Sequence, residues 1–148
     1  MEFPTAEWID QVAAEASADA EELAKLGFCN LRLALAVIAA PGGDRALGLV
    51  LDGFDIRSEG EVDLDSWHPD CTLEGPMGAW VDMLTNIAAN GRADLGHTLN
   101  ALTLAEFPMR VTAADPMGRD LFFRYNETLQ AIFDRSARVP TDFPTGVA

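Results

Sequence analysis

The chain has 148 residues, 49% of them hydrophobic, and a formal net charge of −14 at pH 7. This length fits one domain with its own apolar core, so we expect a single domain over residues 1–148, with the core in residues 5–138 and an extended tail at 139–148. The strong negative charge repels phosphate backbones and anionic lipid surfaces, which excludes nucleic acid as an expected partner.

The sequence carries no signal for export, membrane insertion or metal binding. Residues 1–20 lack the basic start and long apolar run of a signal peptide, and the longest apolar stretch, 34–40, is too short to span a bilayer. Cys29 and Cys71 have no CxxC or Cys/His spacing around them, so we expect two buried free thiols, no metal and no cofactor. The expected location is the cytoplasm, without stable membrane insertion.

The first predicted element is an amphipathic helix from Thr5 to Leu26. Thr5 is its candidate N-cap, and Gly27 provides a left-handed stop. Its apolar stripe recurs at steps of three and four residues and consists of Trp8, Val12, Ala16, Ala20 and Leu23.

An antiparallel hairpin is predicted next, because the hydrophobic period changes to two. Leucines and a valine alternate along residues 30–37, and the turn sequence Pro41–Asp44 leads into a second alternating run at 47–52. Residues 54–65 could extend this meander, and residues 71–74 form another short strand.

A second helix is predicted after Gly75, with Pro76 in its first turn and Gly91 closing it. Residues 95–104 fit either a helix or the start of a strand. Residues 109–113 alternate as the last strand.

The clearest predicted helix closes the fold. Asp115 is its candidate cap and Pro116 its first residue, and the tail from Pro140 to Ala148 looks extended or mobile. The apolar residues of this helix follow at helical steps: Leu121, Phe122, Tyr125, Leu129, Ile132 and Phe133.

No catalytic or metal-binding motif stands out. His68 lies in a turn sequence and His97 has no second histidine at ligand spacing, so we expect structural or surface roles for both. Asp63, Asp65 and Asp70 surround Trp67 without the glycine and terminal glutamate of a calcium loop, which favours a solvated loop. Nucleophile elbows and glycine-rich phosphate loops are also absent from the sequence.

The remaining candidate site is the apolar surface shared by the two later helices and the last strand. Such stripes ordinarily form a solid core. Here, large apolar and aromatic residues concentrate in the C-terminal half, whereas the hairpin is built of Leu, Ala and Gly. Small residues beneath bulky ones leave room for a cavity, so the sequence predicts an apolar hollow between these elements.

These elements resemble the sterol carrier protein 2-like family over about residues 8 to 138. The resemblance rests on Asp70–Gly75, the helix with Trp80 that ends at Asn90–Gly91, the strand at Met109–Val111, and Asp115–Gly118 before the closing helix.

The resemblance implies an α+β fold in which a five-stranded, mostly antiparallel sheet is covered on one face by helices. It also implies an apolar tunnel that takes sterols, fatty acids or acyl-CoA, in a domain that binds and does not catalyse. Transferred to this sequence, the residues expected to line or cap the tunnel are Trp80, Met83, Leu84, Ile87, Met109, Val111, Leu121, Phe122, Tyr125, Leu129 and Phe133.

The favoured hypothesis is therefore binding of an apolar small molecule, with Tyr125 or Arg124 orienting a polar end of the ligand. The scarcity of basic residues argues against acyl-CoA and membrane transfer, and favours a small hydrophobic or steroid-like ligand.

Two alternatives stay open. One is a small cone-shaped isomerase or dehydratase that acts on a hydrophobic substrate through His97, Asp82 or Asp115; its weakness is the closing helix, because such cones usually finish in strands. The other is a regulatory or interaction subunit that uses an exposed Trp67 loop or the acidic first helix. The sequence also leaves a homodimer open.

Overall fold

The computed structural model describes residues 1–144 and contains one five-stranded sheet in the order β3-β2-β1-β4-β5. The strands are β1 (Cys29–Ile38), β2 (Arg45–Gly53), β3 (Asp55–Glu61), β4 (Cys71–Pro76) and β5 (Arg110–Thr112). Only the central pair β1–β4 is parallel among the four pairs of this sheet, and the other three pairs are antiparallel. The mostly antiparallel five-stranded sheet implied by the resemblance is thus confirmed.

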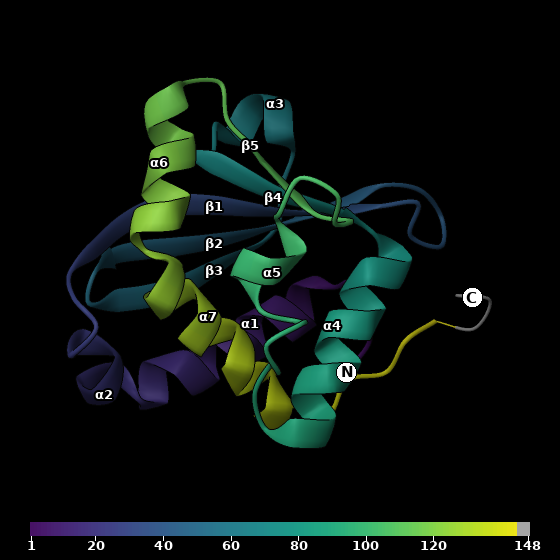
Figure 1. The fold of residues 1–148 in the computed structure, drawn as a ribbon, viewed down its shortest axis with the longest axis horizontal. Coiled ribbons are helices and arrows are strands. Elements are labelled where there is room, and N and C mark those ends of the chain that lie inside the picture. The colour runs from purple at the N-terminus through teal and green to yellow at the C-terminus, as the bar shows by residue number, and fades with distance from the viewer. Residues whose placement is uncertain (145–148) are drawn as a thin grey trace.

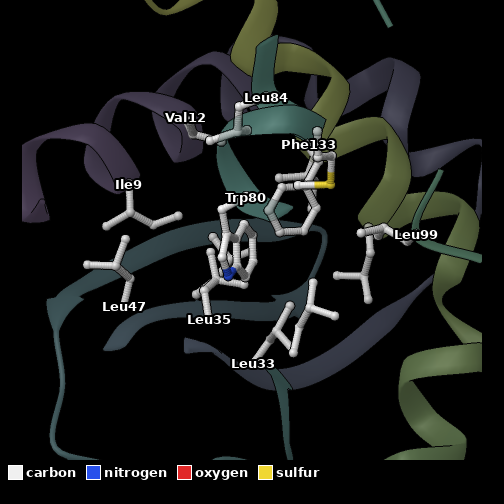
Figure 2. Close-up of a cluster of buried hydrophobic side chains, with 14 of the residues drawn as sticks. Ile9, Val12, Leu33, Leu35, Leu47, Trp80, Leu84, Leu99 and Phe133 are labelled. Carbon is white, nitrogen blue, oxygen red and sulfur yellow. The ribbon is translucent and has the colours of Figure 1, made fainter. Parts of the chain in front are cut away.

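Helices α1, α4 and α7 pack on the face of the sheet that carries Leu33, Leu35 and Leu47 (Figures 1 and 2). The short helix α3 is an exception, because its Trp67 contacts Gly48, whose side of β2 faces away from Leu47. The helical segments are α1 (Ala6–Ala18), α2 (Ala20–Ala24), α3 (Leu64–Trp67), α4 (Met77–Asn90), α5 (Leu99–Leu102), α6 (Pro116–Arg124), α7 (Asn126–Asp134) and the 3-10 turn η1 (Arg135–Arg138). In residues 1–144, no helix has the length and apolar character that crossing a membrane requires.

The predicted first helix exists as two pieces, because the chain breaks at Asp19. The N-cap is confirmed: the Trp8 amide donates a hydrogen bond to Thr5 Oγ1 over 3.2 Å. The carboxylate of Asp19 accepts hydrogen bonds from Arg135 Nε at 3.1 Å and from Arg138 at 2.6 Å. These ion pairs join the end of α1 to η1. Helical periodicity could not reveal this tertiary contact.

The predicted hairpin is confirmed, and its register places Leu33 opposite Leu49 and Leu35 opposite Leu47. Its turn is closed by Asp44, whose carboxylate accepts a hydrogen bond from the Ala39 amide at 2.8 Å. The meander continues into β3, but the predicted extension to residue 65 is wrong in its last part, since residues 64–67 form α3. β4 then crosses to the other side of β1 and pairs with it in parallel.

Helix α4 begins one residue later than predicted. Pro76 is its N-cap, with extended backbone dihedrals, and Gly91 ends it with φ +77°, as expected. The ambiguous segment at 95–104 contains helix α5. The Leu99 amide at the start of α5 donates to Gln130 Oε1 of α7 at 2.7 Å, so a tertiary contact selects the helix.

The closing helix has the predicted cap but is bent. Asp115 Oδ1 accepts a hydrogen bond from the Met117 amide at 2.9 Å, and Pro116 is the first helical residue. At Tyr125 the backbone leaves helical geometry, with φ −97° and ψ 15°, so α6 and α7 are separate helices. The bend allows Phe122 of α6 and Leu129 of α7 both to be fully buried.

The core is larger than the predicted residues 5–138. Phe3 is fully buried, and its ring centroid lies 4.8 Å from that of Trp8. The Phe3 amide donates to the carbonyl of Asp142 at 2.9 Å, so the segment up to residue 144 runs as an extended strap beside the N-terminus. Residues 145–148 of the predicted tail lie outside the described residues.

Candidate ligand-binding site

All eleven residues predicted to line a tunnel lie in the layer between the sheet and the helices or at the edge of this layer. Leu121 and Tyr125 are half-buried. The other nine are buried, and they are Trp80, Met83, Leu84, Ile87, Met109, Val111, Phe122, Leu129 and Phe133.

Side chains fill the space in which the sequence predicts a hollow. The indole of Trp80 donates a hydrogen bond from Nε1 to the Ala36 carbonyl at 3.1 Å, so this edge of the ring is directed toward β1 (Figure 2). The ring centroids of Phe133 and Phe3 lie 6.1 Å and 6.0 Å from that of Trp80. Leu121 borders a surface pocket that Pro69, Asp70, Ala114, Asp115, Met117 and Gly118 also line. Ligand contact by all eleven residues stays a prediction.

A small cavity lies elsewhere, at the end of the sheet where α2, β1, β2, β3 and α7 meet. Its volume is about 10 Å³. We call it the sheet-end cavity, and its lining, which contains no charged side chain, consists of Leu23, Ala24, Gly27, Cys29, Leu51, Gly53, Phe54, Ile56 and Thr128.

Three large apolar side chains form an exposed rim beside this cavity. Leu26, Phe28 and Phe54 are 43%, 59% and 54% exposed. The two phenyl rings meet edge to face, with centroids 5.5 Å apart. Gly53 makes this contact possible, because its φ of +68° suits glycine and a Cβ would lie 3.2 Å from the Phe28 ring.

Two buried polar side chains belong to the cavity lining. Cys29 at the start of β1 is 2% exposed, and Thr128 in α7 is 5% exposed. Burial raises the pKa of the Cys29 thiol, and a hydrogen bond with Thr128 opposes part of that rise. The thiol also lies 3.9 Å from the Gly27 carbonyl, to which it donates. Both thiols of the chain are free and buried, as predicted.

Thr128 is the residue that sequence reasoning missed. The hypothesis chose Tyr125 or Arg124 to orient a ligand, but neither lines the cavity, and Arg124 is exposed. Thr128 lies four residues before Ile132 on the apolar stripe of the closing helix. A polar side chain on such a stripe was the available signal.

A surface cluster joins His97 to two carboxylates. Nδ1 lies 2.6 Å from Asp94 Oδ1 and Nε2 lies 3.1 Å from Asp82 Oδ2. The hydrogen bond to Asp94 is the main cause that raises the pKa of His97, and the contact with Asp82 adds to it. Because both ring nitrogens face carboxylates, the imidazolium form is favoured. Asp115, the third candidate of the enzyme hypothesis, caps α6.

The loop around Trp67 is largely exposed and Trp67 itself is half-buried, so the interaction hypothesis stays open. The Arg32 guanidinium stacks over the Trp67 ring at 4.3 Å from its centroid. The predicted solvated carboxylates are partly engaged: Asp63 caps α3, and Asp70 accepts a hydrogen bond from the Arg32 amide at 2.8 Å. Within residues 1–144, no group of three or more His, Cys, Asp or Glu side chains is placed to hold a metal ion.

Comparison with known proteins identifies the architecture. Neither a protein-family model nor a curated protein sequence matches the chain. The solution structure of a conserved hypothetical protein from Thermus thermophilus, described as a candidate sterol carrier protein, superposes with a TM-score of 0.61 at 16% identity, over 90% of this chain and 89% of that one. A crystal structure of sterol carrier protein 2 superposes with a TM-score of 0.59 at 15% identity, over 89% of this chain and 98% of that one. The chain therefore has the fold of sterol carrier protein 2, as the sequence resemblance implied.

Proposed function

We propose that the protein binds an apolar small molecule without catalysing a reaction on it, and that the ligand reaches the interior through the sheet-end cavity. The observation that carries this proposal is the pairing of an uncharged cavity with an exposed rim of Leu26, Phe28 and Phe54. Clustered exposed apolar side chains are characteristic of sites that meet an apolar partner. The shared fold with proteins named as sterol carriers supports the same class of ligand.

Binding requires the cavity to grow. A volume of about 10 Å³ holds roughly one water molecule, whereas pockets for small molecules measure roughly 300–1,000 Å³. The wall that must move is α7, because it contributes Thr128 to the lining and leads from there to the buried Leu129 and Phe133. Displacing α7 from the sheet would bring the residues predicted from the sequence into contact with the ligand.

The energetic balance allows this rearrangement. A steroid-sized ligand that buries roughly 400 Å² of apolar surface gains roughly 10 kcal/mol, at about 25 cal/mol per Å². Association and displacement of the helix consume part of this gain. We therefore expect affinities no tighter than micromolar, which corresponds to about −8 kcal/mol.

The surroundings of the candidate catalytic groups support a non-catalytic role. His97 is held by Asp94 and Asp82 away from the sheet-end cavity lining, and Asp115 serves as a helix cap. A buried Thr128 and a buried neutral Cys29 can position a ligand but do not form an acid–base pair.

The test is binding of Nile red, a neutral apolar fluorophore, to delipidated protein, with a Phe54→Ser variant and a Phe107→Ser control. The two phenylalanines are 54% and 51% exposed, but only Phe54 lines the cavity. We expect Phe54→Ser to weaken binding about tenfold, since roughly 1–2 kcal/mol of apolar contact is lost, and Phe107→Ser to leave it unchanged.

Native mass spectrometry and solvent extraction of protein from its own cells provide the second measurement. A retained lipid or steroid that is recovered chemically intact after prolonged incubation supports a carrier. Absence of any ligand together with absence of Nile red binding would contradict the proposal, and conversion of the ligand by the protein would favour the enzyme hypothesis.

A further inference from the structure

We infer that the ligand carries a neutral polar group, a hydroxyl or a carbonyl, which hydrogen-bonds with the side chain of Thr128, and that the site rejects ionised carboxylates. This inference rests on the proposed function and deepens it, because it specifies the chemical class of ligand and the residue that selects it.

Thr128 is placed to recognise such a group. Its side chain is 5% exposed, lines the sheet-end cavity, and comes from the helix that must move for a ligand to enter. A threonine hydroxyl both donates and accepts, so it matches an alcohol as well as a carbonyl. In the structure, the polar group that shares the cavity lining with it is the Cys29 thiol, a weak hydrogen-bonding group. When the cavity opens, an oxygen of the ligand can take the place of the Cys29 sulfur beside Thr128. Oxygen is the stronger hydrogen-bonding partner for the hydroxyl group.

The cavity offers nothing to stabilise a buried anion. No Lys, Arg or His lines it. Burial keeps the Cys29 thiol neutral, because its pKa is raised. Transferring an ionised carboxylate into such surroundings without a cationic partner costs several kcal/mol, whereas a hydroxyl that forms its hydrogen bond costs far less.

The charges around the rim also disfavour a ligand with an ionised carboxylate. Residues 21–28 and 52–56, which carry the rim, contain four carboxylates and one ammonium group, that of Lys25. The nearby Arg57 is 3.8 Å from the carboxylate of Asp52, so its charge is partly compensated. An approaching carboxylate therefore meets a net negative surface, and a neutral amphiphile does not.

The experiment compares dodecan-1-ol with dodecanoate, which share one alkyl chain, as competitors of Nile red on the full-length protein at pH 8. We expect the alcohol to bind roughly a hundredfold more tightly than the ionised acid. Thr128→Val, which replaces the hydroxyl by a methyl group of similar size, should weaken binding of the alcohol about fivefold to tenfold. Thr128→Ser should restore it, and Thr112→Val, a hydroxyl removal outside the cavity, should have no effect.

Three results would overturn the inference. The first is that dodecanoate binds as tightly as the alcohol. If the Lys25→Gln variant then lost its binding of dodecanoate, a cation at the rim would be the group that recognises acids. Thr128→Val could fold and bind the alcohol like the wild type. If Nile red binds but neither amphiphile displaces it, the proposed selection is wrong while apolar binding stands. If Nile red does not bind and no ligand is recovered by extraction, the proposed function falls as well. The comparison of alcohol and acid on the wild type stands even where a variant fails to fold.

Discussion

Nε2 of His97 lies 3.1 Å from Oδ2 of Asp82, which ties the loop between α4 and α5 to helix α4. The other ring nitrogen faces Asp94 at 2.6 Å, and Asp94 is itself held by Asn86 of α4 through a hydrogen bond of 2.9 Å from Nδ2. The loop leads directly to Leu99, which is fully buried against the core. The cluster therefore fixes the loop that covers this side of the interior.

The stability conferred by His97 should depend on pH. Its pKa is raised in the folded state by the carboxylates of Asp94 and Asp82. For a raised pKa, the stabilisation is fully present below the unfolded value of about 6.5 and is lost as the pH rises through the folded pKa. In urea unfolding, the wild type should therefore exceed His97→Gln in stability by more at pH 6 than at pH 9.

The contact between His97 and Asp82 can also be tested through the pKa of His97. Asp82→Asn keeps the shape of the side chain and removes its charge, so the pKa of His97, followed by NMR, should fall toward its ordinary value. A wild-type pKa at or below about 6.5 would contradict the arrangement of His97 between two carboxylates.

Gly118 should not tolerate a side chain. A Cβ there would lie 1.9 Å from the carbonyl oxygen of Asp70, so Gly118→Ala forces α6 away from the segment that leads into β4. We expect a loss of about 3 kcal/mol or more in the free energy of unfolding. Gly96→Ala is the control, because its nearest atom would be Asp94 Oδ1 at 3.7 Å. Equal effects of the two substitutions on urea unfolding would refute the close contact.

Both cysteines should resist alkylation in the folded protein. Burial, with a contribution from the negative charge of Asp70, raises the pKa of the Cys71 thiol to about 12, and burial also raises that of Cys29. At pH 8, iodoacetamide should label neither residue in buffer and both in urea, as read by peptide mass spectrometry. Rapid labelling of Cys71 without denaturant would show that β4 is not packed as described. Selective labelling of Cys29 would instead indicate that the sheet-end cavity opens in solution.

The packing of the interior can be tested at Phe133. This side chain is 1% exposed and its ring lies 6.1 Å from that of Trp80, so Phe133→Ala should cost about 3–5 kcal/mol of stability. Phe107→Ala, at a side chain that is 51% exposed, should cost less than about 1 kcal/mol. A small effect at Phe133 would indicate that a hollow already lies between α7 and the sheet.

The order and type of most elements could be predicted because each follows from local chemistry. Alternation along residues 30–37 and 47–52 predicted β1 and β2, and the Asp115–Pro116 pair predicted the start of α6. The helix breaks at Asp19 and Tyr125 could not be predicted in this way, since the apolar stripes continue across both positions.

For the candidate site, too, one part could be predicted from the sequence and another part could not. The order of residues shows which faces of the helices and strands are apolar, and it therefore predicts that Trp80, Leu129 and Phe133 are buried, because side-chain periodicity decides the orientation of each residue on its element. The amount of space left between those faces follows from the packed fold alone, because that volume depends on how side chains from distant segments interlock. The packed fold also places Thr128 of α7 and Cys29 of β1 in one cavity lining, a juxtaposition that no local pattern encodes.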